Sequence, residues 1–133
     1  MRFLMVLFAS LAMTVAAGSA YSAGDAAKGK KQFSRCKACH SVEAGKNKVG
    51  PSLHGVVGRK AGTAAKYHYS KSLKAAGEKG LVWTEDKIME YLAGPTAFLK
   101  KYLGVKSVHN KMKNKFKKES LRENIIAYLK TQK

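Results

Sequence analysis

The pentapeptide Cys36-Lys37-Ala38-Cys39-His40 has the form CxxCH, and this stretch decides the fold. Two thiols three residues apart lie on the same side of one helical turn, so both can add to vinyl groups on one edge of a porphyrin. The histidine that follows is then close enough to turn an imidazole nitrogen onto the iron. The pattern therefore predicts covalent attachment of a c-type haem, with His40 as the proximal ligand.

Other interpretations of the cysteine pair make demands that this sequence does not meet. A thioredoxin-like redox pair is expected within a βαβ pattern, and a structural zinc site needs four ligands. The chain has only two cysteines, and no second CxxC or HxxxH follows. A surface disulfide between Cys36 and Cys39 remains the alternative to haem attachment.

Residues 1–22 have the layout of a secretory signal peptide, which leaves residues 23–133 as a single domain. Arg2 provides the positive start, an apolar run covers residues 3–17, and small residues follow. We expect cleavage before Ala23, give or take a few residues, and a periplasmic protein in which haem is attached after export. The apolar run is shorter than the about 20 residues of a membrane span, and an uncleaved anchor is the alternative.

The chain carries 26 basic and 8 acidic residues, a formal net charge of +18, or +17 once Arg2 leaves with the signal peptide. A charge of this size on a small domain predicts an anionic partner. Nucleic acid is not expected as that partner, because the protein is expected to be exported. A protein face or a lipid surface remains.

Apolar periodicity and capping residues predict an all-α fold. Asp25 and Thr84 are expected N-caps, and Ser120 with Glu123 forms a capping-box pattern. The pattern predicts three main helices at about 25–36, 84–94 and 120–130, and short helices at 70–76 and 96–102.

The stretch 41–82 is rich in glycine and poor in apolar residues. A segment this irregular counts against a compact fold unless something else organises it. We expect the haem itself to form much of the core, with this loop folded around it.

Taken together, several segments resemble the class I cytochromes c, the group of bacterial cytochrome c2 and mitochondrial cytochrome c. The segments cover nearly all of the expected domain: GKKQF at 29–33, CKACH at 36–40, GPSLHGVVGRKAG at 50–62, YS at 69–70, Trp83, EYL at 90–92 and RENIIAYLK at 122–130. The resemblance implies three main helices, with short helices and long loops, wrapped around one covalently attached haem c.

The resemblance also implies roles for residues around the haem. The carbonyl of Pro51 would accept a hydrogen bond from the outer N–H of His40. Arg59, Tyr69 and Trp83 would hydrogen-bond the inner haem propionate.

The helix packing that the resemblance implies gives a glycine inside the first helix its reason. Gly29 and Phe33 would pack across the last helix, against Ile125 and Tyr128. Tyr91 would lie over the haem face.

The sixth iron ligand must come from outside the motif. Met112 lies in an irregular loop where the family's distal thioether is expected, with His109 as the main rival, whereas Met89 sits inside a helix and is expected in the core. The expected site is therefore Cys36, Cys39, His40 and Met112, with His40 and Met112 on the iron.

One position departs from the family. An aromatic residue usually stands two positions after the ligand methionine and shields the haem edge, whereas this chain has Asn114 there, with Phe116 two further on. Either Phe116 provides the shielding or the haem edge is wetter.

These features imply a mobile electron carrier and not an enzyme. Iron held by imidazole and thioether changes by one electron between Fe²⁺ and Fe³⁺ with both axial positions filled. We expect a monomer that docks, through lysines around the haem edge, on acidic faces of membrane redox complexes. These would be a bc1-type donor and, as acceptor, a terminal oxidase, a peroxidase or a photosynthetic reaction centre. The docking lysines would include Lys37, Lys48, Lys100, Lys101, Lys111 and Lys113.

Two other functions stay open at this point. One is a haem enzyme or gas-binding c-type protein with an open sixth position. The other is a cytochrome subunit permanently docked on a dehydrogenase.

Overall fold

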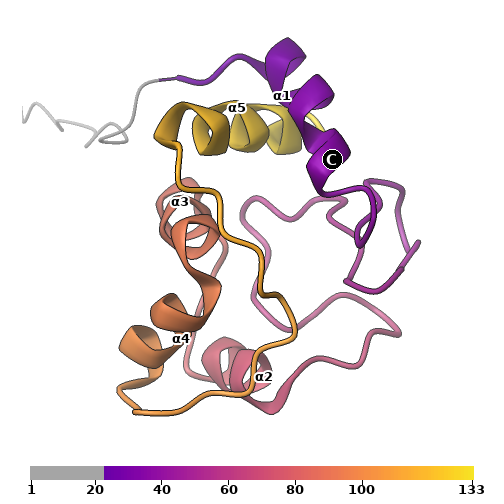
Figure 1. Ribbon diagram of the computed structural model, residues 1–133. Coiled ribbons are helices and arrows are strands. Elements are labelled where there is room, and N and C mark those ends of the chain that lie inside the picture. Colours follow the sequence, from indigo (N-terminus) through magenta and orange to yellow (C-terminus); the bar gives the residue numbers. More distant parts are fainter. Residues whose placement is uncertain (1–22) are drawn as a thin grey trace, which may run out of the picture.

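The structure is a computed structural model that describes residues 23–133, and the described residues form an all-α fold without β-strands, as predicted (Figure 1). The expected signal peptide, residues 1–22, lies outside the described residues. Among residues 23–133, no helix combines the length and the apolar character needed to cross a bilayer. The elements are α1 (Ala26–Gln32), a 3₁₀ turn η1 (Phe33–Arg35), α2 (Lys71–Glu78), α3 (Glu85–Ala93), α4 (Pro95–Leu103) and α5 (Glu119–Lys130).

Capping side chains start three of these helices, and two of them, Asp25 and Thr84, are the predicted caps. Asp25 accepts a hydrogen bond from the backbone N–H of Lys28 at 2.9 Å. Ser70 and Thr84 cap α2 and α3 in the same way. Each side-chain oxygen satisfies one of the backbone donors that a helix start leaves free.

Several predicted helix ends are wrong by a few residues: α2 continues to Glu78, and α4 begins at Pro95. The capping-box prediction made Ser120 the N-cap of α5, but the observed N-cap is Lys118, two residues earlier, which makes no side-chain cap. Arg122 instead donates from Nη1 to the carbonyls of Phe116 and Lys117, both at 2.7 Å, and so fixes the chain that enters the helix. The first helix ends at Gln32, and a 3₁₀ turn continues it towards the cysteines.

Helices α1 and α5 cross at close range, as Figure 1 shows in the upper part of the molecule. A Cβ atom on Gly29 would lie 1.9 Å from the carbonyl oxygen of Asn124, so only glycine permits this approach. Phe33 packs its ring 5.3 Å from that of Tyr128 and is almost fully buried, as is Ile125. The crossing confirms the expected contact of Gly29 and Phe33 with the last helix.

Helices α3 and α4 join the core through an aromatic cluster. The ring of Tyr91 lies 4.8 Å from that of Trp83 and 5.6 Å from that of Phe98, and all three side chains are buried. Edge-to-face contacts of this kind stabilise a core beyond the area they bury. The cluster fixes Tyr91 and Trp83 at the border of the central pocket.

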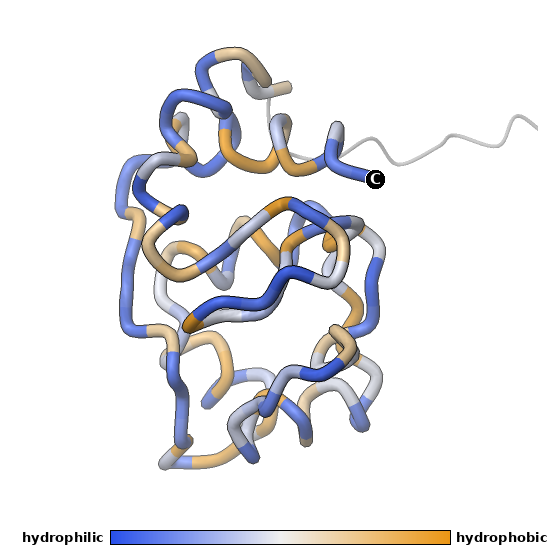
Figure 2. The backbone as a smooth tube through the Cα atoms, turned by 90° about the vertical axis from the view of Figure 1, so that its right-hand side faces the viewer, coloured by the Kyte–Doolittle hydropathy of each residue, from blue (hydrophilic) through white to orange (hydrophobic). Residues whose placement is uncertain are grey.

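The long loop between η1 and α2 forms the other half of the molecule. Figure 2 views this side, where hydrophilic backbone prevails and hydrophobic stretches are short. Backbone hydrogen bonds anchor the loop: Gly58 and Ala61 donate to Trp83 and Leu81, and Trp83 donates to Arg59, each at 2.8 or 2.9 Å. This pairing brings Arg59 next to Trp83, 24 residues away in the sequence.

Candidate functional site

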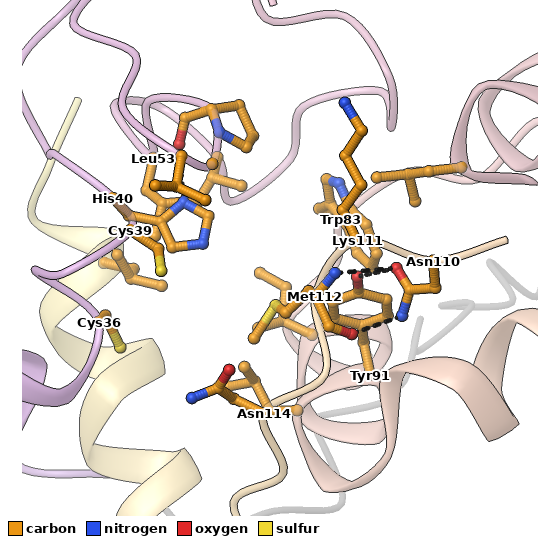
Figure 3. Close-up of a pocket in the computed structure, with 18 of the residues that line it drawn as sticks. Cys36, Cys39, His40, Leu53, Trp83, Tyr91, Asn110, Lys111, Met112 and Asn114 are labelled. Atoms are coloured by element: carbon orange, nitrogen blue, oxygen red, sulfur yellow. Dashed lines mark hydrogen bonds between the residues drawn. The ribbon is translucent and has the colours of Figure 1, made fainter. Parts of the chain in front are cut away.

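A large pocket lies between the loop half and the helical half of the described residues (Figure 3). Its walls are largely apolar, because Leu53, Val56, Leu92, Ile125 and Leu129 all face it. Its ionisable lining residues other than tyrosine, cysteine and histidine are the basic Arg35, Arg59 and Lys111. The pocket therefore suits a flat, mostly apolar group that carries negative charge.

The two cysteines lie on one wall of the pocket, with their sulfur atoms in view from its centre (Figure 3). Both are free thiols, so the alternative of a surface disulfide is not seen. Burial raises the pKa of Cys36 to about 11, with the neighbouring Cys39 adding to the rise. Among the described residues no cluster of three or more histidine, cysteine, aspartate or glutamate side chains forms a metal site of their own.

His40 is held in one orientation by the loop that follows it. Its Nδ1 donates to the carbonyl of Pro51 at 2.8 Å, the contact that the resemblance implied. The other ring nitrogen then carries the lone pair. Burial lowers the pKa of His40, although the hydrogen bond to Pro51 works against this, so the ring is neutral and able to bind a metal at neutral pH.

The sequence did not single out what Gly50 does for that ring. A Cβ atom at this position would lie 2.3 Å from Cε1 of His40 and 2.7 Å from its Nδ1. Any side chain would therefore displace the imidazole. The signal was present in the Gly50-Pro51 pair, but a glycine before a proline more often indicates a turn.

Met112 lies on the opposite wall, and its sulfur points across the open centre towards His40 (Figure 3). Met89 is buried in the core, where its sulfur lies 3.2 Å from Nε of Arg122, as expected for a core residue. His109, the rival candidate, is exposed, and its backbone N–H donates to Ser72. Of the three candidates, Met112 is the one that lines the pocket.

A polar corner of the pocket contains Arg59, Tyr69 and Trp83. Two nitrogens of Arg59 donate to the carbonyls of His54 and Ser52 at 3.0 Å, but its Nε is buried and has no partner among the described residues. Burial lowers the pKa of Arg59. A half-buried cation with a buried, unused donor calls for an anion, and a haem propionate would supply one.

The mouth of the pocket is polar at the position where the family has an aromatic residue. Asn114 is exposed and lines the mouth, whereas Phe116 is buried in the wall and donates its backbone N–H to Leu92 at 2.8 Å. Lys111 crosses to the loop half, where its ammonium group bonds the carbonyl of His68 and lies 5.3 Å from the centre of the Tyr67 ring. Phe116 therefore does not cover the mouth at residue 114.

Asn110 is a further residue at the site that the sequence analysis did not single out. It is 3% exposed, and its side chain bonds Met112 and Tyr91 (Figure 3). Asparagine is usually a surface residue, so a sequence gives no sign of its burial.

The lining residues fit a haem c. The thiols of Cys36 and Cys39 and the neutral imidazole of His40 lie on one wall, and the thioether of Met112 lies on the opposite wall. Apolar side chains line the sides, and Arg59 has an unpartnered donor at one corner. These are the donors and the environment that a covalently held porphyrin with two axial ligands requires.

Comparison with known proteins agrees with this geometry. The family model described as "Cytochrome c" matches residues 26–133. Cytochrome c2 of Rhodopseudomonas palustris is 50% identical over 115 residues, which cover 82% of this chain and 99% of that protein. Cytochrome c2 of Cereibacter sphaeroides is 41% identical over 138 residues, which cover 97% and 95%.

Solved structures show the same fold. Cytochrome c2 of Rhodospirillum centenum has a TM-score of 0.78 and 45% identity, and covers 82% of this chain and 98% of its own. Ferric cytochrome c-550 of Paracoccus versutus has a TM-score of 0.75 at 35% identity, and covers 82% and 98%. With the haem-attachment motif, the pocket, the family model and these relatives in agreement, the chain belongs to the cytochrome c family.

Proposed function

We propose that this protein is a mobile single-haem cytochrome that carries one electron at a time between redox partners in the periplasm. The observation that carries the proposal is the pair His40 and Met112, which face one another across one apolar pocket beside the two cysteines. The similarity to proteins named cytochrome c2 supports an electron carrier over an enzyme. The signal-like sequence of residues 1–22 supports export to the periplasm.

As a member of the cytochrome c family, the chain carries one covalently attached haem c. That group supplies a one-electron change between Fe²⁺ and Fe³⁺. In our proposal Cys36 and Cys39 hold it by thioether bonds, while His40 and Met112 bind the iron. The apolar walls exclude water, and a thioether ligand in such a site favours the ferrous state.

Two further residues support this arrangement. Pro51 fixes the tautomer of His40, which keeps the inward nitrogen free to bind. Arg59 offers its unused donor to a propionate. With His40 and Met112 both on the iron, no axial position would be left open for a substrate, which suits a carrier better than an enzyme that binds a substrate at the metal.

The charge distribution supports docking at the pocket mouth. Residues 44–77 and 91–118 supply most of the pocket walls, and neither segment contains an acidic residue. Acidic residues are confined to other parts of the chain, for example Glu85 and Asp86 on α3. An acidic partner face would therefore be steered towards the pocket mouth and away from α3.

The ligand assignment can be tested by spectroscopy on the haem-loaded protein. We expect the ferric wild type to show the weak far-red band of sulfur bound to iron, and the ferrous form to resist carbon monoxide. Met112→Ala should lose the band and bind carbon monoxide, while His109→Ala keeps the wild-type behaviour. A wild type that binds carbon monoxide readily would instead indicate the open sixth position of an enzyme or gas-binding protein.

The docking surface can be tested with a matched pair of charge reversals. Lys113→Glu alters a lysine beside the pocket mouth, and Lys106→Glu makes the same charge change in the exposed turn after α4. We expect Lys113→Glu to slow electron transfer to an acidic partner several-fold at low salt, and Lys106→Glu to slow it much less. High ionic strength should remove the difference, because screening shortens the reach of these charges. Equal rates for the two variants would contradict docking at this mouth.

A further inference from the structure

Asn110 is a buried polar residue in an otherwise irregular segment. It is 3% exposed, and Ser52 and Ser70 are the other polar residues buried to a similar degree among residues 23–133. Burying an amide costs free energy unless its donors and acceptor are used. Asn110 lies two residues before Met112, so its buried amide can act on the backbone that carries the proposed ligand.

The Asn110 amide pairs with both backbone groups of Met112. Its Nδ2 donates to the Met112 carbonyl at 2.7 Å, and its Oδ1 accepts from the Met112 N–H at 3.4 Å (Figure 3). The first bond is short and the second is weak by distance. Between them they fix the direction in which the Met112 backbone presents its side chain to the pocket.

The same amide is tied to the helical core. The hydroxyl of Tyr91, on α3, lies 3.5 Å from Oδ1 of Asn110. Tyr91 itself is held by the rings of Trp83 and Phe98. A chain of contacts thus runs from the aromatic cluster, through Tyr91 and Asn110, to the backbone of Met112.

No regular element carries Met112, so the segment needs such a fixed point. Residues 111–118 lie outside helices, and lysines alternate along the segment at positions 111, 113, 115 and 117. These lysines are exposed and repel one another, so their charges give the segment no order of its own.

We propose that Asn110 is the positioning residue for the distal ligand: its buried amide holds the Met112 backbone against α3, so that the thioether stays on the iron. This rests on the proposed function, in which Met112 binds the iron. Without the amide, the Met112 carbonyl and N–H lose their partners, and the thioether leaves the iron more readily.

The test compares Asn110→Ala with Asn47→Ala. Asn47 is a half-buried asparagine whose amide also makes two backbone hydrogen bonds, to Ala65 at 2.8 Å and from Ser52 at 2.9 Å, but it lies outside the pocket lining. Added imidazole competes with Met112 for the ferric iron, so its apparent affinity reports how firmly the thioether is held. Loss of one or two hydrogen bonds predicts about tenfold tighter imidazole binding in Asn110→Ala and a change within about twofold in Asn47→Ala.

Tyr91→Phe provides a second variant that keeps the ring and removes only the hydroxyl. We expect a smaller rise in imidazole affinity, about threefold, because the two bonds between Asn110 and Met112 remain. Global unfolding in denaturant is measured on each variant, so that lost stability is separated from a looser thioether.

Each outcome decides a different point. Tighter imidazole binding in Asn110→Ala but not in Asn47→Ala, with the far-red band present in the wild type, supports the proposal. Unchanged affinity in both Asn110→Ala and Tyr91→Phe, or an equal rise in Asn47→Ala, overturns it and leaves Met112 as the ligand. A wild-type ferric protein without the far-red band, with a spectrum that Met112→Ala does not alter, overturns the proposed ligand itself.

Discussion

Replacing Gly29 with alanine tests the packing on which the fold depends. Alanine is the better helix former by about 1 kcal/mol, so propensity alone predicts that Gly29→Ala stabilises α1. The structure predicts the opposite, because the new Cβ atom would lie 1.9 Å from the backbone oxygen of Asn124 and 2.9 Å from Cβ of Tyr128. The sign of the change in the free energy of unfolding therefore shows whether helix propensity or the contact between α1 and α5 dominates at this position.

The size of the effect follows from how far the helices must separate. Ordinary contact at a Cβ atom begins near 3.4 Å, so α1 must move about 1.5 Å from α5 to relieve the contact at 1.9 Å. A gap of that size removes much of the attraction between Phe33, which is 1% exposed, and Tyr128, whose ring lies 5.3 Å away. Overpacking of this kind typically costs more than the helix propensity gains, and we expect a net loss of about 2 kcal/mol or more.

The assay is denaturant unfolding of the haem-loaded protein, followed by helical circular dichroism. Lys30→Ala, an exposed neighbour on the same helix, provides the control and should leave the free energy of unfolding nearly unchanged. A Gly29→Ala variant as stable as the wild type, or more so, would refute the argument that close contact between α1 and α5 requires glycine.

Three further predictions concern the pocket. Gly50→Ala should displace the His40 ring and destabilise the haem-loaded protein by about 1–3 kcal/mol in denaturant unfolding, whereas Val49→Ala next to it, 75% exposed, should not. Arg59→Met removes a half-buried positive charge that favours the ferrous state, so the reduction potential in a spectroelectrochemical titration should fall by tens of millivolts, and a rise would contradict this role. Burial raises the pKa of Tyr91 to about 12, so the unfolded chain releases this proton at lower pH than the folded protein. The free energy of unfolding should therefore fall as the pH rises from about 10 to about 12, and urea unfolding of Tyr91→Phe should lack this part of the fall, up to about 2–3 kcal/mol.

The sequence by itself determined the features that depend on neighbouring residues. Spacing alone identified the motif at residues 36–40, and apolar periodicity with Asp25 and Thr84 as caps located the helices. The excess of basic residues gave the sign of the partner's charge. These inferences succeed because a thioether pair, a helix cap and a net charge are local or summed properties of the chain.

Only the tertiary structure decided which distant residues meet. It showed that Gly50 touches the His40 ring, that Asn110 is buried against Met112, and that Arg59 lies with an unused donor in the pocket. It also corrected the start of α5, where Arg122 holds the entering chain by its backbone carbonyls. Each of these results depends on burial and on contacts between segments that are far apart in the sequence or outside regular elements. The apolar periodicity of the sequence does not predict such contacts, because they form only when the chain has folded around the pocket.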